Sequence, residues 1–442
     1  MKRKAMDHPL QQPQPRASAP PMNSKPRFLV VNGIRYIRPY LYDQTYSVRM
    51  QHADQKLTIA EVLAHAFGRE SNQWKDSVKY FHNEIAHGRV QWKRNKLKRD
   101  DDEPKFQTVL NADEPTRRND ILKIQRHIHE RCMVGADLVT IPCYSSNHNT
   151  TAHNNHDSHD AYIAVLKPAG IPVVGSDGAC HGSVTGILQG DDDDYRLGHR
   201  IDLPVSGILL LGKGPSRAKK IVQALSPTAK QASDGFAKAY LARVKGGKDA
   251  FGGKGANDRM EIKCKLQWDN RQKKAIAVED ESVDNRSEEA KKHKSKKTCK
   301  ETVTYVQQLQ YDPASDTSLV RVELLTGARQ QIRAVLASLG TPIIGDTTYD
   351  GGEFPSNEGN EDLKLFHDDD NQSLLTMLQE EHKEWCDKCR WQIQEVKKGG
   401  TKRGTEQLGH QICLLSYHYR IPALGIDAKV PDELIPEWAK MR

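Results

Sequence analysis

The sequence predicts an α+β protein in which a sizeable core is surrounded by solvated insertions. Strand-like and helix-like apolar patterns are mixed along the chain without a regular strand–helix–strand repeat, which favours this class over a parallel α/β sheet. The chain has 442 residues and a hydrophobic content of 37%, which is enough for two domains with tails. Aromatic residues contribute only 6% and charged residues 28%, a balance typical of long surface excursions.

The net charge and the cysteines indicate the kind of partner and the redox compartment, but they do not indicate an activity. The formal net charge of +8 is compatible with a polyanionic partner, although many enzymes with neutral substrates are mildly basic. Eight cysteines without a regular framework indicate a reducing compartment. No apolar run approaches the roughly 18 residues of a membrane helix, and the N-terminus lacks the apolar centre of a secretory signal. We expect no membrane contact and a cytoplasmic or nuclear location, with a mitochondrial one left open.

The N-terminal part predicts a tail followed by a small folded module. Residues 1–27 are rich in proline and glutamine and predict disorder, and the module is expected over residues 28–144. It begins with an apolar run that leads into Asn32-Gly33, a hairpin signal. Two helical patterns and a basic, strand-like segment follow, at residues 57–67, 77–88 and 89–99.

A polar, low-complexity stretch at residues 145–160 separates this module from a second domain at residues 161–442. Histidines in the stretch could bind a metal, but without fixed ligand spacing a disordered linker is the favoured interpretation. In the second domain, polar and charged blocks predict surface insertions near residues 247–300 and 355–405. The expected strands cover residues 162–166, 207–212, 239–246 and 318–325, and the expected helices begin at Ser216 and Gln330.

The spacing Gly207-ILLL-Gly212-Lys213 resembles a nucleotide-binding P-loop but does not fit one. A P-loop needs a flexible loop between its glycines and a Ser or Thr after the lysine. Here the four middle residues are those of a strand core, and Gly214 replaces the hydroxyl. The sequence therefore excludes nucleotide hydrolysis at this motif.

The segment LGHRIDLPVSGILLLGK at residues 197–213 carries the first chemical signal. Asp202 follows His199 and Arg200 and precedes a proline-containing loop and an apolar strand. An adjacent cation favours the ionised form of a carboxyl group, and an ionised carboxylate at the mouth of a strand can act as a nucleophile or a base. A loop-capping salt bridge is the structural alternative, and residue types alone favour it.

The same segment resembles the signature of the RluA-type RNA pseudouridine synthases, H-R-L-D-x-x-T-S-G-L-L-L-x-A-K. The resemblance runs from His199 to Lys213, with Val205 where threonine is common. In the last matching motif, Ala328 and Gln330 replace the usual arginine and histidine. Three further segments match in the order of the family, namely IAVLKPAGIPV (163–173), KAYLARVKG (238–246) and LLTGARQQIRAVLASLGTPIIGDTTYDGG (324–352).

The resemblance implies an α+β catalytic domain with a mixed, mainly antiparallel sheet and a central cleft. RYIRPYLYDQTY, IAHGRV and EWCDKC resemble the eukaryotic branch that modifies uridine-32 in the tRNA anticodon loop. The N-terminal module resembles a divergent S4-like α/β RNA-binding module. The expected partner is RNA, with tRNA favoured, and the expected form is a monomer. Cys386 and Cys389 could bind zinc, but free thiols are the favoured interpretation because structural zinc usually needs four ligands.

The resemblance also implies a role for each candidate residue, and it implies no metal and no organic cofactor. Asp202 is expected to be the catalytic carboxylate, Arg333 its ion-pair partner and Tyr240 the ring that packs on the flipped base. Arg200 is expected to fill the gap that the base leaves, with His199 beside it. Salt bridges, strand packing and solvated charges are the structural alternatives. Pocket lining is expected from Ile332 and Leu209, and RNA binding from Lys93, Arg94 and Lys96.

Three interpretations follow. The first is an enzyme that isomerises uridine to pseudouridine in structured RNA, either tRNA or, alternatively, rRNA or mRNA. The second is a non-catalytic RNA-binding protein on the same scaffold, against which the intact set of Asp202, Tyr240 and Arg333 argues. The third is a metal-binding regulatory module based on the histidine-rich stretch and the CxxC pair.

Overall fold

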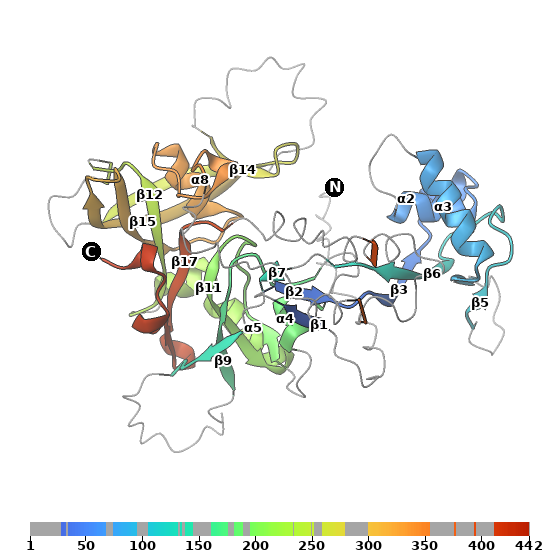
Figure 1. Cartoon of the computed structure of the whole chain (residues 1–442), viewed down its shortest axis with the longest axis horizontal. Helices are drawn as coiled ribbons and strands as arrows, with labels where there is room; N and C mark the ends of the chain where they lie inside the picture. The colour runs from blue at the N-terminus through green and yellow to red at the C-terminus, as the bar shows by residue number, and fades with distance from the viewer. Residues whose placement is uncertain are drawn as a thin grey trace, which may run out of the picture. The chain divides into compact units, whose positions relative to one another are not determined.

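The chain divides into two compact units (Figure 1), which are described separately. The described part of the first lies within residues 39–129, and the second combines residues 28–38 with residues 130–442. The tail, the linker and most residues of the second expected insertion lie outside the described residues. The computed structural model describes residues 28–31, 34–67, 74–94, 105–130, 133–134, 138–144, 161–175, 181–188, 195–232, 234–248, 250–251, 259–278, 299–353, 375–376, 393–394 and 411–441.

The first unit is a four-stranded sheet, in the order β3-β6-β4-β5, with helices packed on it. At the start of α2, Thr58 N–H donates to Glu61 Oε2 at 2.9 Å and Glu61 N–H donates to Thr58 Oγ1 at 3.3 Å, a capping box. The two helices expected in this part of the sequence are confirmed by α2 and α3. The elements are β3 (Tyr40–Ser47), α1 (Met50–Asp54), α2 (Ile59–Phe67), α3 (Trp74–Ala86), β4 (Val90–Lys93), β5 (Gln107–Thr108) and β6 (Ile121–Ile128).

The second unit is built on an 11-stranded sheet, in the order β14-β13-β15-β16-β12-β17-β11-β9-β8, with β10 beside β11 and β18 beside β17. Among the described strand pairs only β11 and β17 run parallel, so the expected mixed, mainly antiparallel sheet is confirmed. The strands are β8 (Val139–Ile141), β9 (Tyr162–Lys167), β10 (Tyr195–Leu197), β11 (Ser206–Lys213), β12 (Ala237–Lys245), β13 (Met260–Asp269), β14 (Lys274–Val278), β15 (Cys299–Asp312), β16 (Thr317–Leu324), β17 (Leu414–Ile421) and β18 (Ile426–Lys429).

Short helices and one small sheet complete the second unit. The helix α5 buries Ala218 and Ile221, and α8 packs its alanines against the β13–β14 hairpin. The predicted N-terminal hairpin is confirmed, because Val31 pairs with Ile34 across two residues. The remaining elements are β1 (Phe28–Val31), β2 (Ile34–Ile37), β7 (Met133–Val134), α4 (Val184–Leu188), α5 (Gly214–Ala224), α6 (Pro227–Ala232), α8 (Gln331–Ser338), η2 (Thr347–Tyr349), η4 (Pro422–Leu424), η5 (Asp432–Leu434) and η6 (Glu437–Ala439).

The segment at residues 247–300, which was expected to be a surface insertion, contributes two strands to the sheet. Both β13 and β14 lie within it, and β13 pairs along eight residues with β15. In β13, Ile262 and Leu266 are buried at even spacing between more exposed residues. This alternation is the strand signal, and the neighbouring charge blocks obscured it.

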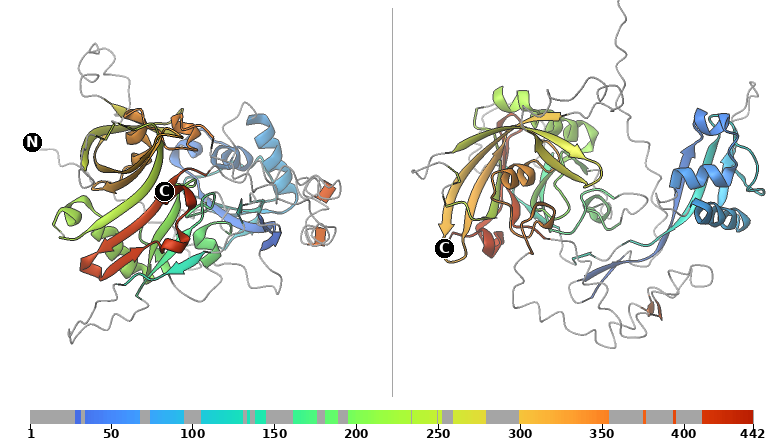
Figure 2. Two further views of the ribbon diagram at one scale, coloured as in Figure 1. Left: turned by 60° about the vertical axis from the view of Figure 1, so that its left-hand side comes forward. Right: turned by 90° about the horizontal axis from the view of Figure 1, so that it is seen from above.

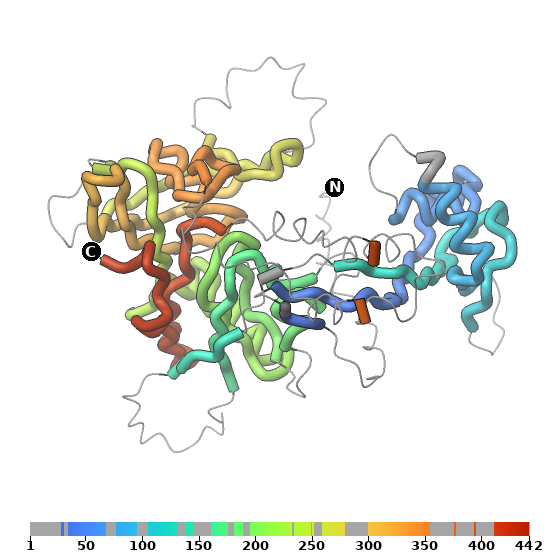
Figure 3. The backbone as a smooth tube through the Cα atoms, in the orientation of Figure 1, coloured from blue at the N-terminus to red at the C-terminus, as the bar shows by residue number. Residues whose placement is uncertain are grey.

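The C-terminal strand β17 lies in the middle of this sheet, between β12 and β11 (Figures 2 and 3). Its contact with β11 is very close at Gly207, which has a φ of +113°. A Cβ atom at this position would lie 2.3 Å from the carbonyl oxygen of Ser416 and 2.6 Å from its nitrogen. The glycine of the HRID segment is therefore required by the approach of two strands and by its own backbone conformation.

Replacing Gly207 with alanine is expected to lower the free energy of unfolding by about 3 kcal/mol, because the new methyl group meets backbone atoms that cannot move aside. Gly246→Ala is the matched control, since Gly246 also has a positive φ of +62° but nothing within 4 Å of its Cβ position. That variant should lose only about 1 kcal/mol. Denaturant unfolding of both variants makes the comparison, and equal losses would contradict the packing argument.

Candidate active site

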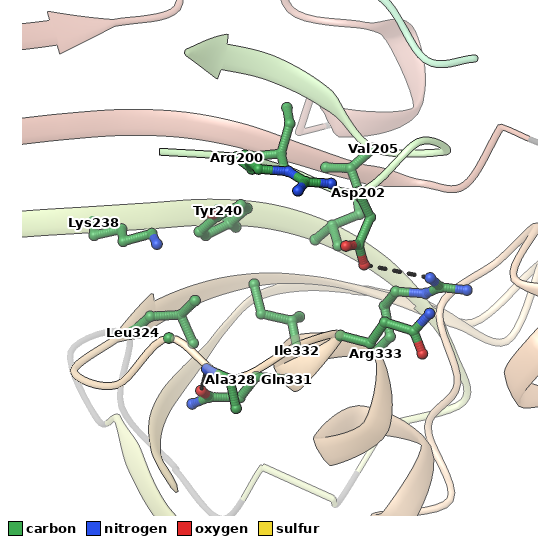
Figure 4. A pocket seen from close by; sticks show the side chains of 14 residues that line it. Arg200, Asp202, Val205, Lys238, Tyr240, Leu324, Ala328, Gln331, Ile332 and Arg333 are labelled. Atoms are coloured by element: carbon green, nitrogen blue, oxygen red, sulfur yellow. Dashed lines mark hydrogen bonds and ion pairs between the residues drawn. The ribbon is translucent and has the colours of Figure 1, made fainter. Parts of the chain in front are cut away.

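A pocket lies in the second unit between the loop before β11, the start of β12 and the start of α8 (Figure 4). One wall carries a carboxylate and an exposed arginine, the second a lysine and a tyrosine, and the third apolar and amide side chains together with a buried arginine. The lining residues are Arg200, Ile201, Asp202, Val205, Lys238, Tyr240, Leu324, Gly327, Ala328, Gln330, Gln331, Ile332, Arg333 and Leu414.

The loop that carries Asp202 connects β10 with β11 and begins at a defined point. Gly198 N–H donates to the carbonyl oxygen of Leu210 at 2.9 Å, which extends the β10–β11 ladder. His199 then ends the ladder with its side chain, because its Nε2 accepts the N–H of Leu210 at 3.0 Å. The chain turns from there, and Val205 N–H donates to the carbonyl oxygen of Asp202 at 3.2 Å. The carboxylate of Asp202 lines the pocket with 34% of its side chain exposed.

Arg333 connects Asp202 with a second carboxylate, that of Asp346. Arg333 Nη1 donates to Asp202 Oδ2 at 3.4 Å, the contact that Figure 4 marks with a dashed line. Its shorter bonds go to Asp346, whose two oxygens accept from Nε at 2.6 Å and from Nη2 at 2.8 Å. A bidentate pair fixes the plane of the guanidinium. Asp202 therefore faces a cation whose position is set by Asp346.

The surroundings keep Arg333 charged. Burial alone would lower the pKa of Arg333, but the hydrogen bonds and charge of Asp346, followed by the charge of Asp202, raise it above its ordinary value. The ring of Tyr349 lies nearby, 5.2 Å from the guanidinium carbon to the ring centroid. Burial raises the pKa of the Tyr349 hydroxyl to about 12, so this group adds no third negative charge near neutral pH. The Asp202 carboxylate therefore faces a cation that is fixed in place, and a carboxylate can act as a nucleophile or a base.

The sequence did not indicate a role for Asp346, although this residue stands in the last matching motif. It lies 13 residues beyond Arg333, outside the helix that carries the arginine. Its side chain also accepts the N–H of Thr348 at 3.2 Å and so caps the short helix η2. The available sequence signal for Asp346 was an aspartate just before a short turn. That pattern predicts a helix cap and does not predict the ion pair with Arg333.

The hydroxyl of Tyr240 belongs to a hydrogen-bonded chain behind the pocket. Tyr240 Oη lies 3.2 Å from Tyr419 Oη, which lies 3.4 Å from His199 Nδ1. Because Nε2 of His199 accepts the N–H of Leu210, its neutral imidazole carries the proton on Nδ1 and donates towards Tyr419. Desolvation and then the charge of Lys238 lower the pKa of His199 to about 3. The imidazole therefore stays neutral near pH 7. Its Nδ1–H orients the hydroxyl groups of Tyr419 and Tyr240 in the same donor direction.

Lys167 ties the loop after β9 to the loop of Asp202. Its side chain is buried, and its ammonium donates to the carbonyl oxygens of Pro168 at 2.8 Å, Ile171 at 2.9 Å and Leu203 at 3.1 Å. Burial lowers the pKa of Lys167 to about 7, while the charge of Asp202 opposes that shift. The lysine of the KPAG segment therefore positions the residue that directly follows Asp202.

The other predicted pocket residues have different positions. Ile332 lines the pocket, and Arg200 lines it as an exposed side chain. Leu209 does not line it, because it is fully buried in β11, on the strand face opposite to Ile208 and Leu210 of the core cluster. Lining residues that the sequence did not indicate include Ile201, Lys238, Leu324 and Leu414.

The residues predicted to bind RNA belong to the first unit. Lys93 ends β4 and Arg94 follows it. The guanidinium carbon of Arg94 lies 3.7 Å from the ring centroid of Trp92, and Nη1 pairs at 3.2 Å with Asp120, which is fully buried. Arg94 therefore stabilises the unit itself, while Lys96 lies outside the described residues.

Neither a metal site nor a membrane helix is present in the part of the chain that the structure describes. Among these residues, no group of three or more His, Cys, Asp or Glu side chains is placed to hold a metal ion. No helix within them is long and apolar enough to cross a membrane. The histidine-rich stretch at 145–160 and the pair Cys386 and Cys389 lie outside the described ranges.

Known proteins resemble this chain in the region that carries the pocket. Residues 161–338 match the model of the family described as RNA pseudouridylate synthase. The chain is 25% identical over 236 residues to the tRNA pseudouridine(31) synthase of Saccharomyces cerevisiae. These residues cover 52% of this chain and 54% of the yeast protein. It is 29% identical over 192 residues to the dual-specificity RNA pseudouridine synthase RluA of Vibrio parahaemolyticus, covering 43% and 66% of the two chains.

A plant protein matches a longer part of the chain. RNA pseudouridine synthase 7 of Oryza sativa subsp. japonica is 25% identical over 325 residues, which cover 73% of this chain and 67% of the plant protein. The match to the yeast relative, in contrast, spans about half the length of that protein.

The neutral His199 predicts a specific pH dependence of stability. Its pKa is about 3 in the folded chain, against an ordinary value of 6.5, so the unfolded chain binds the extra proton as pH falls below 6.5. This contribution to stability is present above that pH and is lost progressively towards pH 3. Between pH 7 and pH 5, the wild type should therefore lose about 2 kcal/mol more than His199→Gln. Denaturant unfolding at both pH values measures this, with His418→Gln as the control.

Proposed function

We propose that this chain isomerises specific uridines of structured RNA to pseudouridine, which the match of residues 161–338 to the RNA pseudouridylate synthase family and the similarity to RluA support. The observation that carries the proposal is the position of Asp202, which lines the pocket beside the buried Arg333. Tyr240 lines the same pocket from β12. The pocket thus combines a reactive carboxylate, a fixed cation and an aromatic face.

The reaction begins with extrusion of the uridine from its RNA stack, because stacking hides the C1′ and C5 atoms. Tyr240 and Ile332 line the pocket (Figure 4), and the ring of Tyr240 is proposed to pack on the uracil. Arg200, exposed beside the pocket, fills the gap that the base leaves in the RNA.

Asp202 starts the chemistry, either by attack on the sugar or by proton abstraction. The C1′–N1 bond breaks, the uracil turns, and a C1′–C5 bond forms. C5 loses its proton and N1 gains one, so that the product is an isomer of the substrate and no co-substrate is consumed. Arg333 faces the Asp202 carboxylate, and Asp346 holds Arg333 in place.

We further propose that the RNA is a tRNA and that the modified uridine lies in its anticodon loop. The name of the yeast relative specifies a tRNA, and that of the Vibrio relative describes dual specificity, which supports tRNA but leaves rRNA or mRNA as the alternative. The unit at Pro39–His129 is proposed to be an S4-like RNA-binding module. In that module Lys93 and Lys96 are proposed to contact RNA. Maps of pseudouridine across total RNA, with and without the protein, identify the target uridine.

Asp202→Asn should abolish product formation while RNA affinity stays within about twofold, because the substitution removes the reactive group and hardly changes the volume. The measurement is single-turnover conversion of the mapped target RNA, with binding to the same RNA measured in parallel. Asp427→Asn is the matched control, since Asp427 is 32% exposed but pairs with His418 away from the pocket lining. Turnover by Asp202→Asn at a rate comparable to the control would remove Asp202 from the mechanism.

A further inference from the structure

The turn between β13 and β14 is anchored to the wall of the pocket. Ala275 N–H donates to Tyr349 Oη at 2.9 Å, and Gln330 Oε1 accepts the Tyr349 hydroxyl at 2.8 Å. Gln330 lines the pocket, as does Ala328, which packs in one apolar cluster with Ala275 and Trp268. The hairpin therefore holds a fixed position beside the pocket.

Arg329 stands on this edge with its charge towards solvent. Its two neighbours, Ala328 and Gln330, line the pocket, whereas Arg329 is exposed. Its guanidinium carbon lies 3.7 Å from the ring centroid of Trp268 in β13. A stacked guanidinium has a defined plane and keeps its N–H edges available for hydrogen bonds. In the described part of the chain, no carboxylate forms an ion pair with Arg329.

Further cations lie in and beside the turn that follows Trp268 along the chain. Arg271 and Lys273 are exposed in the turn, and the Lys274 ammonium lies 5.7 Å from the ring centroid of Tyr349. The one carboxylate of the turn, Asp269, accepts the backbone N–H groups of Arg271 and Gln272 and so holds the turn itself. We call this surface the hairpin patch, which consists of Trp268, Arg271, Lys273, Lys274 and Arg329.

We propose that the hairpin patch binds the phosphate backbone of the RNA strand next to the flipped uridine, with Arg329 on a phosphate and Trp268 as its support. The proposal rests on the proposed function, because it needs an RNA strand at the pocket. A planar guanidinium matches the oxygens of a phosphate in two parallel bonds. In the family pattern an arginine occupies the position of Ala328. In this chain the cation stands one residue later, at Arg329, where the indole of Trp268 orients it outside the pocket.

The test compares Arg329→Gln with Arg259→Gln. Arg259 is also exposed and stacked, 4.4 Å from the ring centroid of Tyr305. It directly precedes β13 and thus lies nine residues, or about 30 Å, from Trp268 along the strand. It pairs with Glu323 at 2.9 Å. The two variants therefore remove the same charge from side chains that lie beside the two ends of β13.

Affinity for unfractionated tRNA is measured as a function of KCl concentration. Arg329→Gln should weaken binding about threefold to tenfold at 0.1 M salt and reduce the slope of log affinity against log salt by about 0.7 to 0.9, the effect of one lost phosphate contact. Arg329→Lys should restore the slope but only part of the affinity, because lysine keeps the charge and loses the planar fork. Arg259→Gln should bind as the wild type does, and thermal unfolding checks that all three variants are folded.

Two results would overturn the proposal. One is a folded Arg329→Gln variant with wild-type affinity and slope, which would point to a different partner for the patch, such as an acidic protein. The other is an equal loss in Arg259→Gln, which would show a general effect of net charge. The proposed function is tested separately, because its failure appears as absent pseudouridine in the product of the wild-type protein, whatever the binding data show.

Discussion

The site depends on one buried guanidinium that is shared by two carboxylates. Asp346 binds Arg333 at 2.6 and 2.8 Å, while Asp202 lies at 3.4 Å. Their side chains are 1% and 34% exposed, respectively. An unpaired buried cation is strongly destabilising, so Asp346 supplies the charge that allows Arg333 to be buried. Asp202 is therefore not needed to pair the buried guanidinium. Its carboxylate remains accessible to a ligand while it still faces Arg333.

The positions of Asp202, Arg333 and Asp346 depend on a change in the strand that neighbours β11, which occurs within a few residues. At Gly207 the strand lies against β17, and further along it pairs with β10. The side chains of Ser416 and His199 satisfy backbone groups at the changeover, since Ser416 Oγ donates to the carbonyl oxygen of Ile208 at 3.1 Å and His199 accepts the N–H of Leu210. The loop of Asp202 leaves the sheet at this point. The geometry of the site therefore depends on a C-terminal strand that lies about 200 residues further along the chain.

Local patterns carried much of the fold and part of the site. Long motifs contain Asp202, Arg333, Tyr240 and Ile332, and all four line one pocket, while their roles stay predictions. Asp346 and Tyr419 were missed, since they act through contacts over 13 and 220 residues that no local spacing displays. The uniform apolar run of β11 has no alternation that could indicate the orientation of Leu209, and charge blocks concealed β13 and β14.

The shared guanidinium is tested most directly by the rate of single-turnover isomerisation in a charge-balanced double variant, Arg333→Gln/Asp346→Asn. Removing the cation together with its structural carboxylate leaves no unpaired charge in the interior. In this variant Asp202 lacks the cation that faces it. The account predicts a folded variant whose single-turnover rate is about 100-fold lower than that of the wild type, the order of magnitude that one fixed electrostatic contact contributes. A folded double variant with the wild-type rate would contradict it.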